Sequence, residues 1–127
     1  IARCYAIAEK AHQGQFRRDG ITPYIIHPKA VADKFNNAIT MCVAILHDVL
    51  EDTCYTAEQS QKEGLDQRVV DAVIKLTKNG SYLDYIKKVA ADPICRAVKI
   101  EDIKHNLLTS AGSQKDKYEL ALYILEK

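Results

Sequence analysis

This sequence is poor in the residues that mark loops, membrane spans and extracellular scaffolds. Its 127 residues include only five glycines, three prolines and no tryptophan. No apolar run approaches the ~20 residues that a helix needs to cross a bilayer. The first residues also lack the charged and then apolar pattern of a secretion signal. We therefore expect a soluble, cytoplasmic protein with no membrane partner.

Neither sign of charge dominates the composition. Eighteen basic and seventeen acidic residues leave a formal net charge of +1. A protein that binds duplex nucleic acid through its phosphates usually carries a broad basic field, which this composition lacks. Nucleic acid is therefore not an expected partner, whereas a homo-oligomer is compatible with the sequence.

The cysteines are few and far apart. Cys4, Cys42, Cys54 and Cys95 form no C-x-x-C pair, which argues against a zinc knuckle or a dithiol redox motif. Scattered cysteines in a cytoplasmic protein are usually reduced, and free cysteine is among the most buried residue types. We interpret them as reduced, mostly buried thiols, and a single disulfide pair is the less favoured alternative.

Most of the chain has the apolar spacing of α-helices. Apolar residues recur three and four positions apart, and no segment alternates as a strand does. We predict an all-α, compact helical bundle that forms a single domain over residues 1–127, with trimmed ends because the first residue is Ile1 rather than methionine. The expected helices cover residues 2–12, 28–36, 39–50, 56–64 and 69–77, and segments that begin at Ser81, Pro93 and Gln114.

The expected helix over residues 39–50 is apolar nearly all round, yet ionisable residues gather at its end. His47 and Asp48 lie there, and Glu51 and Asp52 follow one turn later, where residues four apart share a helix face. Ionisable groups on a buried helix are costly unless an opposite charge neutralises them. A divalent cation would do so, although an HD dipeptide alone also fits a plainer alternative of solvated acids beyond a helix end.

Two further segments offer partners for this pair. His27 lies in PYIIHP, at the entrance of the second expected helix, and Asp102 lies in VKIEDIKHNLLT on the helix that begins at Pro93. Three helices can therefore converge on one site. A donor set of imidazole and carboxylate suits Mn²⁺, Fe²⁺ or Zn²⁺ better than Ca²⁺.

Three long motifs together resemble the HD hydrolase domain of the RelA/SpoT family. They read AHQGQFRRDGITPYIIHP, AILHDVLEDT and AVKIEDIKHNL, and the resemblance runs from about His12 to Thr109. In that family the domain is an all-helical fold that binds Mn²⁺. It removes the 3′-pyrophosphate from guanosine tetra- or pentaphosphate, ppGpp or pppGpp, the alarmones of starvation. The resemblance therefore implies a metal-dependent phosphohydrolase with a guanosine nucleotide as substrate.

The resemblance also implies a role for individual residues. Glu51 and Asp52 match the acidic pair that handles the attacking water. Arg17 matches the arginine that packs on the guanine base, which suits a planar cation. The implied metal ligands are His27, His47, Asp48 and Asp102. The implied nucleotide-binding residues are Arg17, Arg18, Asn106 and Thr109.

Some segments depart from the family pattern. The loop from Gly20 to Pro23 is one residue longer than in many bifunctional members, and Glu101 stands where alanine is common. The segment LTKNGSYLDYIKKVAADP is shorter than in those enzymes and resembles small stand-alone HD proteins. No second domain able to synthesise the alarmone fits in this length, so we expect a hydrolase only.

Two alternatives stay open at this point. The same metal site would serve a phosphohydrolase acting on another nucleotide or on a phosphorylated dinucleotide cofactor. The third hypothesis is a catalytically silent sensor that binds alarmone or metal. Such a sensor would have no chemical need for the acidic pair Glu51 and Asp52. We expect His12 and His105 to pack or to support a ligand, Lys78 and Lys99 to be solvated, and Tyr82 and Tyr85 to lie at the edge of the core.

Overall fold

The computed structural model describes residues 2–17, 19–53, 55–109 and 114–127, with the side chain of Thr109 outside the description. These residues form helices and no β-strand, apart from one isolated bridge between Phe16 and Pro23. The all-α prediction is therefore confirmed. The helices are α1 (Ala2–Ala11), α2 (Ile26–Ala32), α3 (Ala38–Leu46), α4 (Val49–Asp52), α5 (Ala57–Lys62), α6 (Gln67–Leu76), α7 (Tyr82–Ala90), α8 (Pro93–Thr109) and α9 (Lys115–Leu125).

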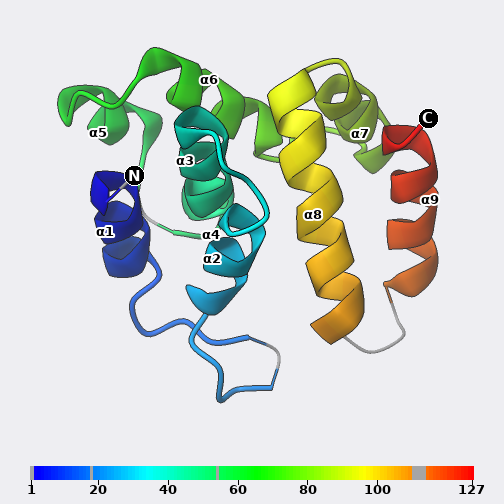
Figure 1. Ribbon diagram of the computed structural model, residues 1–127, viewed down its shortest axis with the longest axis horizontal. Coiled ribbons are helices and arrows are strands. Elements are labelled where there is room, and N and C mark those ends of the chain that lie inside the picture. Colours follow the sequence, from blue (N-terminus) through cyan, green and yellow to red (C-terminus); the bar gives the residue numbers. More distant parts are fainter. Residues whose placement is uncertain (1, 18, 54, 110–113) are drawn as a thin grey trace.

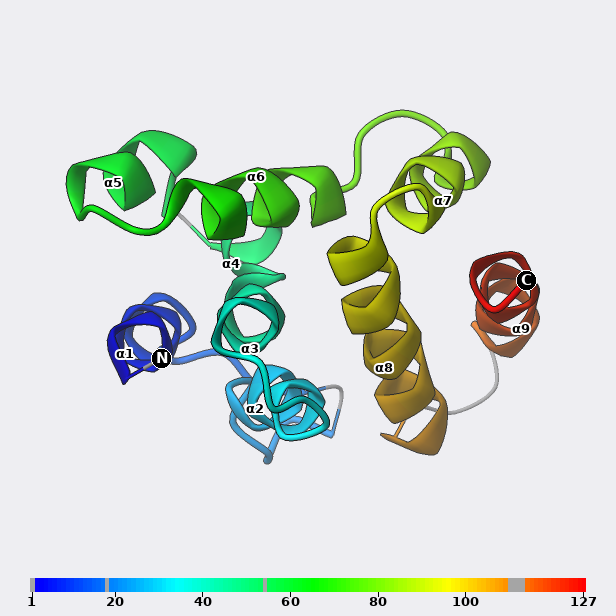
Figure 2. The same ribbon diagram turned by 45° about the horizontal axis from the view of Figure 1, so that its top comes forward.

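Two helices organise the molecule. Helix α3 packs against α1, α2, α6 and α8, and α8 in turn contacts α2, α3, α6, α7 and α9. Figure 1 and Figure 2 show α1 and α9 at opposite ends, with α3 and α8 between them. None of the described helices is both long and apolar enough to cross a membrane.

Local sequence signals account for several helix boundaries. Thr56 and Gln59 form the expected capping box at the start of α5, each side chain binding the other residue's backbone N–H. The side chain of Ser81 likewise accepts a hydrogen bond from the backbone N–H of Asp84 and begins α7. Gly64, with a φ of 73°, ends α5 in a left-handed conformation that favours glycine.

The predicted continuous helix over residues 39–50 is wrong at one point, and that point matters for function. Helix α3 ends at Leu46, and α4 begins only at Val49. Nδ1 of His47 lies 2.5 Å from the carbonyl oxygen of Ala44, the group that an uninterrupted helix would pair with the backbone N–H of Asp48. The histidine side chain thus competes with the helix, and His47 and Asp48 lie in a turn.

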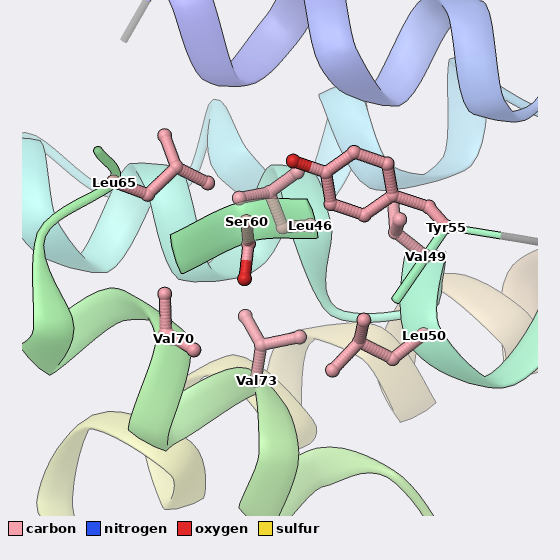
Figure 3. Close-up of a pocket in the computed structure, with 8 residues that line it drawn as sticks. All are labelled: Leu46, Val49, Leu50, Tyr55, Ser60, Leu65, Val70 and Val73. Carbon is pink, nitrogen blue, oxygen red and sulfur yellow. The ribbon is translucent and has the colours of Figure 1, made fainter. Parts of the chain in front are cut away.

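Apolar side chains on both sides of this turn pack against neighbouring helices and hold it in place. Leu46 and Val49, which flank the turn, point into a small apolar pocket between α3, α4, α5 and α6 (Figure 3). The one hydroxyl buried there, that of Ser60, donates a hydrogen bond to the Ala57 carbonyl at 2.6 Å. The Tyr55 hydroxyl is paired with Glu63, so the described residues that line the pocket have no unpaired polar side chain to offer a ligand, and the pocket anchors the turn. Its lining residues are Leu46, Val49, Leu50, Tyr55, Ser60, Leu65, Val70 and Val73.

Candidate metal centre and active site

Three segments that are distant in sequence bring two histidines and two aspartates together. His27 comes from the first turn of α2, His47 and Asp48 from the turn after α3, and Asp102 from the middle of α8. One donor atom from each lies within 4.8 Å of the others. Nε2 of His27 is 2.6 Å from Oδ1 of Asp102, and Nε2 of His47 is 3.0 Å from Oδ2 of Asp48.

The electrostatics of this cluster keep its two carboxylates ionised. Burial by itself would raise the pKa of Asp48, but the charge and hydrogen bond of His47 outweigh it and lower the pKa to about 2. Burial also opposes ionisation of Asp102, yet Lys99 and His47 hold its pKa well below the usual range. The buried carboxylate of Asp102 and the partly buried one of Asp48 therefore stay ionised, and buried charges are paired or coordinate metals. The four residues can hold a divalent cation.

Neighbouring groups orient both imidazoles. The bond to the Ala44 carbonyl requires a proton on Nδ1 of His47, which leaves Nε2 facing the carboxylates. Nδ1 of His27 lies 2.7 Å from Nδ1 of His105, and the two rings stack with centroids 4.9 Å apart. When His27 donates this hydrogen bond, its Nε2 lone pair is free to bind a metal. His105 thus lies where a residue that supports a ligand is expected.

Two residues that were not assigned to the site touch its carboxylates. The Tyr24 hydroxyl donates to Oδ2 of Asp48 at 2.6 Å, and Nζ of Lys99 donates to Oδ2 of Asp102 at 3.0 Å. The expectation of a solvated Lys99 is wrong, because its side chain is only 15% exposed. The signal was present in the sequence, since residues three apart on a helix are neighbours.

A cleft of about 210 Å³ joins the cluster to the acidic pair. Glu51 and Asp52, both on α4, lie on its wall beside Asp48 and Asp102. Burial, followed by repulsion from Asp48 and Glu51, raises the pKa of Asp52 to about 6. A carboxyl group with a pKa near 6 can exchange a proton with water at neutral pH.

Cations and phenols complete the cleft. Lys78 precedes α7, Lys99 lies on α8 and Lys117 on α9, so three segments each supply one ammonium group. Burial and the positive charges of Lys78 and Lys99 lower the pKa of Lys117, so the Lys117 ammonium group lies close enough to the other two for repulsion. Such a cluster is suited to a ligand with several negative charges. The aromatic lining residues are Tyr24, Tyr82, Tyr85 and Tyr118.

The loop between α1 and α2 presents Arg17 to the same region. Its backbone N–H donates to the carbonyl of Thr22 at 2.8 Å, and the side chain of Asp19 accepts from the backbone of Ile21 and Thr22. The Arg17 guanidinium donates to Oδ1 of Asn106 at 3.0 Å. Arg17 and Asn106, two of the predicted nucleotide-binding residues, are therefore hydrogen-bonded although they lie 89 positions apart in the sequence.

The other two predicted nucleotide-binding residues cannot be placed in the same way. Arg18 lies outside the described residues. Thr109 is the last residue of α8, and its side chain lies outside the description. Their assignments stay predictions.

Comparison with known proteins gives relatives that are named as guanosine bis(diphosphate) hydrolases or as GTP pyrophosphokinases. No protein-family model matches the chain. It is 36% identical to a guanosine-3′,5′-bis(diphosphate) 3′-pyrophosphohydrolase of Haemophilus influenzae, over 87% of this chain and 19% of that protein. It is 34% identical to a GTP pyrophosphokinase of Streptomyces coelicolor, over 94% of this chain and 16% of that protein. This chain is a RelA/SpoT homologue. It spans less than a fifth of the length of these two relatives.

A solved structure supports the fold of this RelA/SpoT homologue. The match is to a structure described as a metazoan orthologue of SpoT that hydrolyses ppGpp. The TM-score is 0.78 at 22% sequence identity, and the alignment covers 98% of this chain and 82% of the other. At that identity the likeness concerns the fold, which agrees with the helical arrangement described above.

Proposed function

We propose that this chain is a metal-dependent phosphohydrolase of the HD type that removes the 3′-pyrophosphate from ppGpp or pppGpp. The observation that carries the proposal is the lining of a single cleft. Two of the candidate metal ligands, the acidic pair and three lysines face it together. The names of the relatives, among them a 3′-pyrophosphohydrolase acting on guanosine bis(diphosphate), support this choice of substrate.

His27, His47, Asp48 and Asp102 would hold the metal. Two imidazoles and two carboxylates are a borderline-hard donor set, and we propose Mn²⁺ as the resident ion. A divalent cation there would supply Lewis acidity toward the phosphate and lower the pKa of water toward neutrality. Tyr24 and Lys99 would keep Asp48 and Asp102 ionised and oriented through the hydrogen bonds already described.

The remaining residues divide the chemistry between them. Asp52 would accept a proton from water as it attacks phosphorus, and Glu51 would orient that water. The new bond would join the water oxygen to phosphorus, and the bond between phosphorus and the ribose 3′-oxygen would break. The 3′-oxygen would leave and take a proton from solvent to become a hydroxyl, and the attacked group would be released as pyrophosphate. Lys78, Lys99 and Lys117 would neutralise the negative charge of the phosphates, and Arg17 would pack on the base.

A nucleotide screen tests the proposal directly. The purified chain is incubated with Mn²⁺ and with one candidate substrate at a time. The candidates are ppGpp, pppGpp, nucleotides phosphorylated at the 3′ or 2′ position, and phosphorylated dinucleotide cofactors. The release of phosphate and the release of pyrophosphate are measured separately. Pyrophosphate release from ppGpp supports the proposal. Release of phosphate from another nucleotide alone would favour a different phosphohydrolase, and tight ppGpp binding without any release would favour a silent sensor.

Arg17→Ala should raise KM and leave kcat nearly unchanged. Stacking on a base is made equally in the ground state and the transition state, so its loss weakens binding without changing the chemical step. Steady-state kinetics with ppGpp measure the effect. Lys34→Ala, an exposed cation outside the cleft, is the control. A fall confined to kcat would contradict the role given to Arg17.

His105→Phe should weaken Mn²⁺ binding by about 10- to 100-fold, the usual effect of losing a group that orients a metal ligand. The aromatic ring keeps the stacking on His27 but removes the nitrogen at 2.7 Å. Isothermal titration calorimetry measures the metal dissociation constant. His105→Asn, which can still accept a hydrogen bond, should be closer to the parent. Equal affinity in the phenylalanine variant would show that His27 needs no such partner.

A further inference from the structure

One buried polar side chain near the site has no part in the proposed chemistry. His12 follows α1 directly and is 3% exposed. Its Nδ1 lies 2.9 Å from Oε1 of Gln15. Nε2 of Gln15 in turn donates to the backbone carbonyl of Asp52 at 2.9 Å. His12 is thus two hydrogen bonds away from the residue that we propose accepts a proton.

The direction of these bonds fixes the protonation of the imidazole. A carbonyl oxygen only accepts, so the amide nitrogen of Gln15 must face Asp52 and its amide oxygen must face His12. That oxygen also only accepts, so Nδ1 of His12 must carry a proton. Burial lowers the pKa of His12, which favours a neutral ring with the proton on Nδ1 and a lone pair on Nε2.

The other ring nitrogen shows that packing alone does not explain this histidine. Among the described residues, Nε2 of His12 has no hydrogen-bond partner within the protein. A buried polar atom without a partner destabilises the folded state, whereas an apolar side chain of similar size would not. The fold therefore keeps an imidazole of which one ring nitrogen is paired and the other is not.

Gln15 provides a hydrogen-bond donor at the end of α4. Helix α4 has four residues and ends at Asp52, and the last carbonyls of a helix have no partner within it. The hydroxyl of Thr53 donates a hydrogen bond to the Val49 carbonyl at 2.6 Å. Nε2 of Gln15 donates one to the Asp52 carbonyl. A side chain from the loop after α1 thus fixes the backbone that carries the acidic pair.

We propose that His12 and Gln15 form a positioning relay, in which the Nδ1–H of His12 orients Gln15 and Gln15 orients Asp52. Neither residue touches the substrate in this account. The kinetic role of the relay rests on the proposed function, whereas the relay itself is a property of the folded chain. The two are therefore measured separately.

Nitrogen NMR of the histidine rings tests the relay without any substrate. We expect His12 to be neutral with its proton on Nδ1, which is the minor tautomer of free histidine in water. Gln15→Met, which is similar in length and lacks both the donor and the acceptor, should release this preference. A His12 proton on Nε2, or an unchanged Nδ1–H tautomer in Gln15→Met, would overturn the relay even if the chain hydrolyses no nucleotide.

Kinetics test what the relay does. His12→Leu and Gln15→Met should each lower kcat for ppGpp by about 10- to 100-fold, as expected when a catalytic group is misplaced. KM and the Mn²⁺ dissociation constant should stay within twofold of the parent. Since both residues act through one chain of bonds, the double variant should be no slower than either single variant.

Two comparisons separate positioning from a purely structural role. His12→Asn places an amide N–H where Nδ1–H lies and should restore most of kcat, whereas His12→Gln should not. His12→Leu should unfold at the same temperature as the parent or higher, because an unpaired buried nitrogen is removed. A lower unfolding temperature with equal loss of activity in all four single variants would show that His12 only packs.

Discussion

Asp102→Asn should abolish metal binding and lower turnover by about 10³-fold or more, because Lewis-acid stabilisation is worth several kcal/mol and each 1.36 kcal/mol is a factor of ten. Asp102 is the carboxylate that both imidazoles approach, at 2.6 Å from His27 and 3.2 Å from His47. The substitution keeps the size of the side chain and removes its charge. Metal content after saturation with Mn²⁺ and ppGpp turnover are the two measurements.

The design of this experiment allows for the buried lysine beside Asp102. Losing the partner of a buried charge destabilises a fold, so Lys99 could lower the stability of Asp102→Asn. Asp48→Asn removes a second candidate ligand that is 17% exposed and has no lysine at hydrogen-bond distance among its described contacts. Asp71→Asn, an exposed carboxylate on α6, is the control. Full metal content in both cluster variants would show that the metal site lies elsewhere.

Asp52→Asn and Glu51→Gln should each lower kcat by about 10²- to 10⁴-fold, the usual contribution of a positioned acid or base. Both residues line the cleft, but neither belongs to the four-residue cluster. Metal content and KM should therefore change little. Pre-steady-state and steady-state measurements of pyrophosphate release, together with metal analysis of the same samples, check the two halves of this prediction.

The acidic-pair experiment distinguishes three arrangements. Glu58→Gln, an exposed acid on α5, is the matched control and should keep full activity. Loss of metal in both variants would place Glu51 and Asp52 among the ligands and contradict the assignment. Full turnover in both would show that another group accepts the proton from water.

Much of the site was predictable because the motifs were long. The residue types in PYIIHP, LHD and IEDIKHN identify two imidazoles and two carboxylates, and the structure brings His27, His47, Asp48 and Asp102 together. Helical spacing also placed Glu51 and Asp52 beyond the HD pair, although the chain turns between α3 and α4 rather than continuing as one helix. The capping box of α5 was readable for the same reason, since a cap depends on residues three apart.

Other features depend on contacts that sequence spacing does not report. The bond from Tyr24 to Asp48 joins residues 24 positions apart, that from Gln15 to Asp52 joins residues 37 apart, and that from Arg17 to Asn106 joins residues 89 apart. Each requires the packing of whole helices against α3 or α8. For the same reason the burial of Lys99 and the gathering of three lysines on one cleft were not foreseen.

The sequence by itself determined the helical class, most helix positions and the chemical identity of the candidate ligands, because these follow from residue type and from neighbours within one helical turn. The tertiary structure alone decided where α3 stops, which nitrogen of His27 and His47 faces the carboxylates, and which cations face the acidic pair. These outcomes depend on competition for a single hydrogen-bond partner or on solvent exclusion, and both are settled only when distant segments pack together.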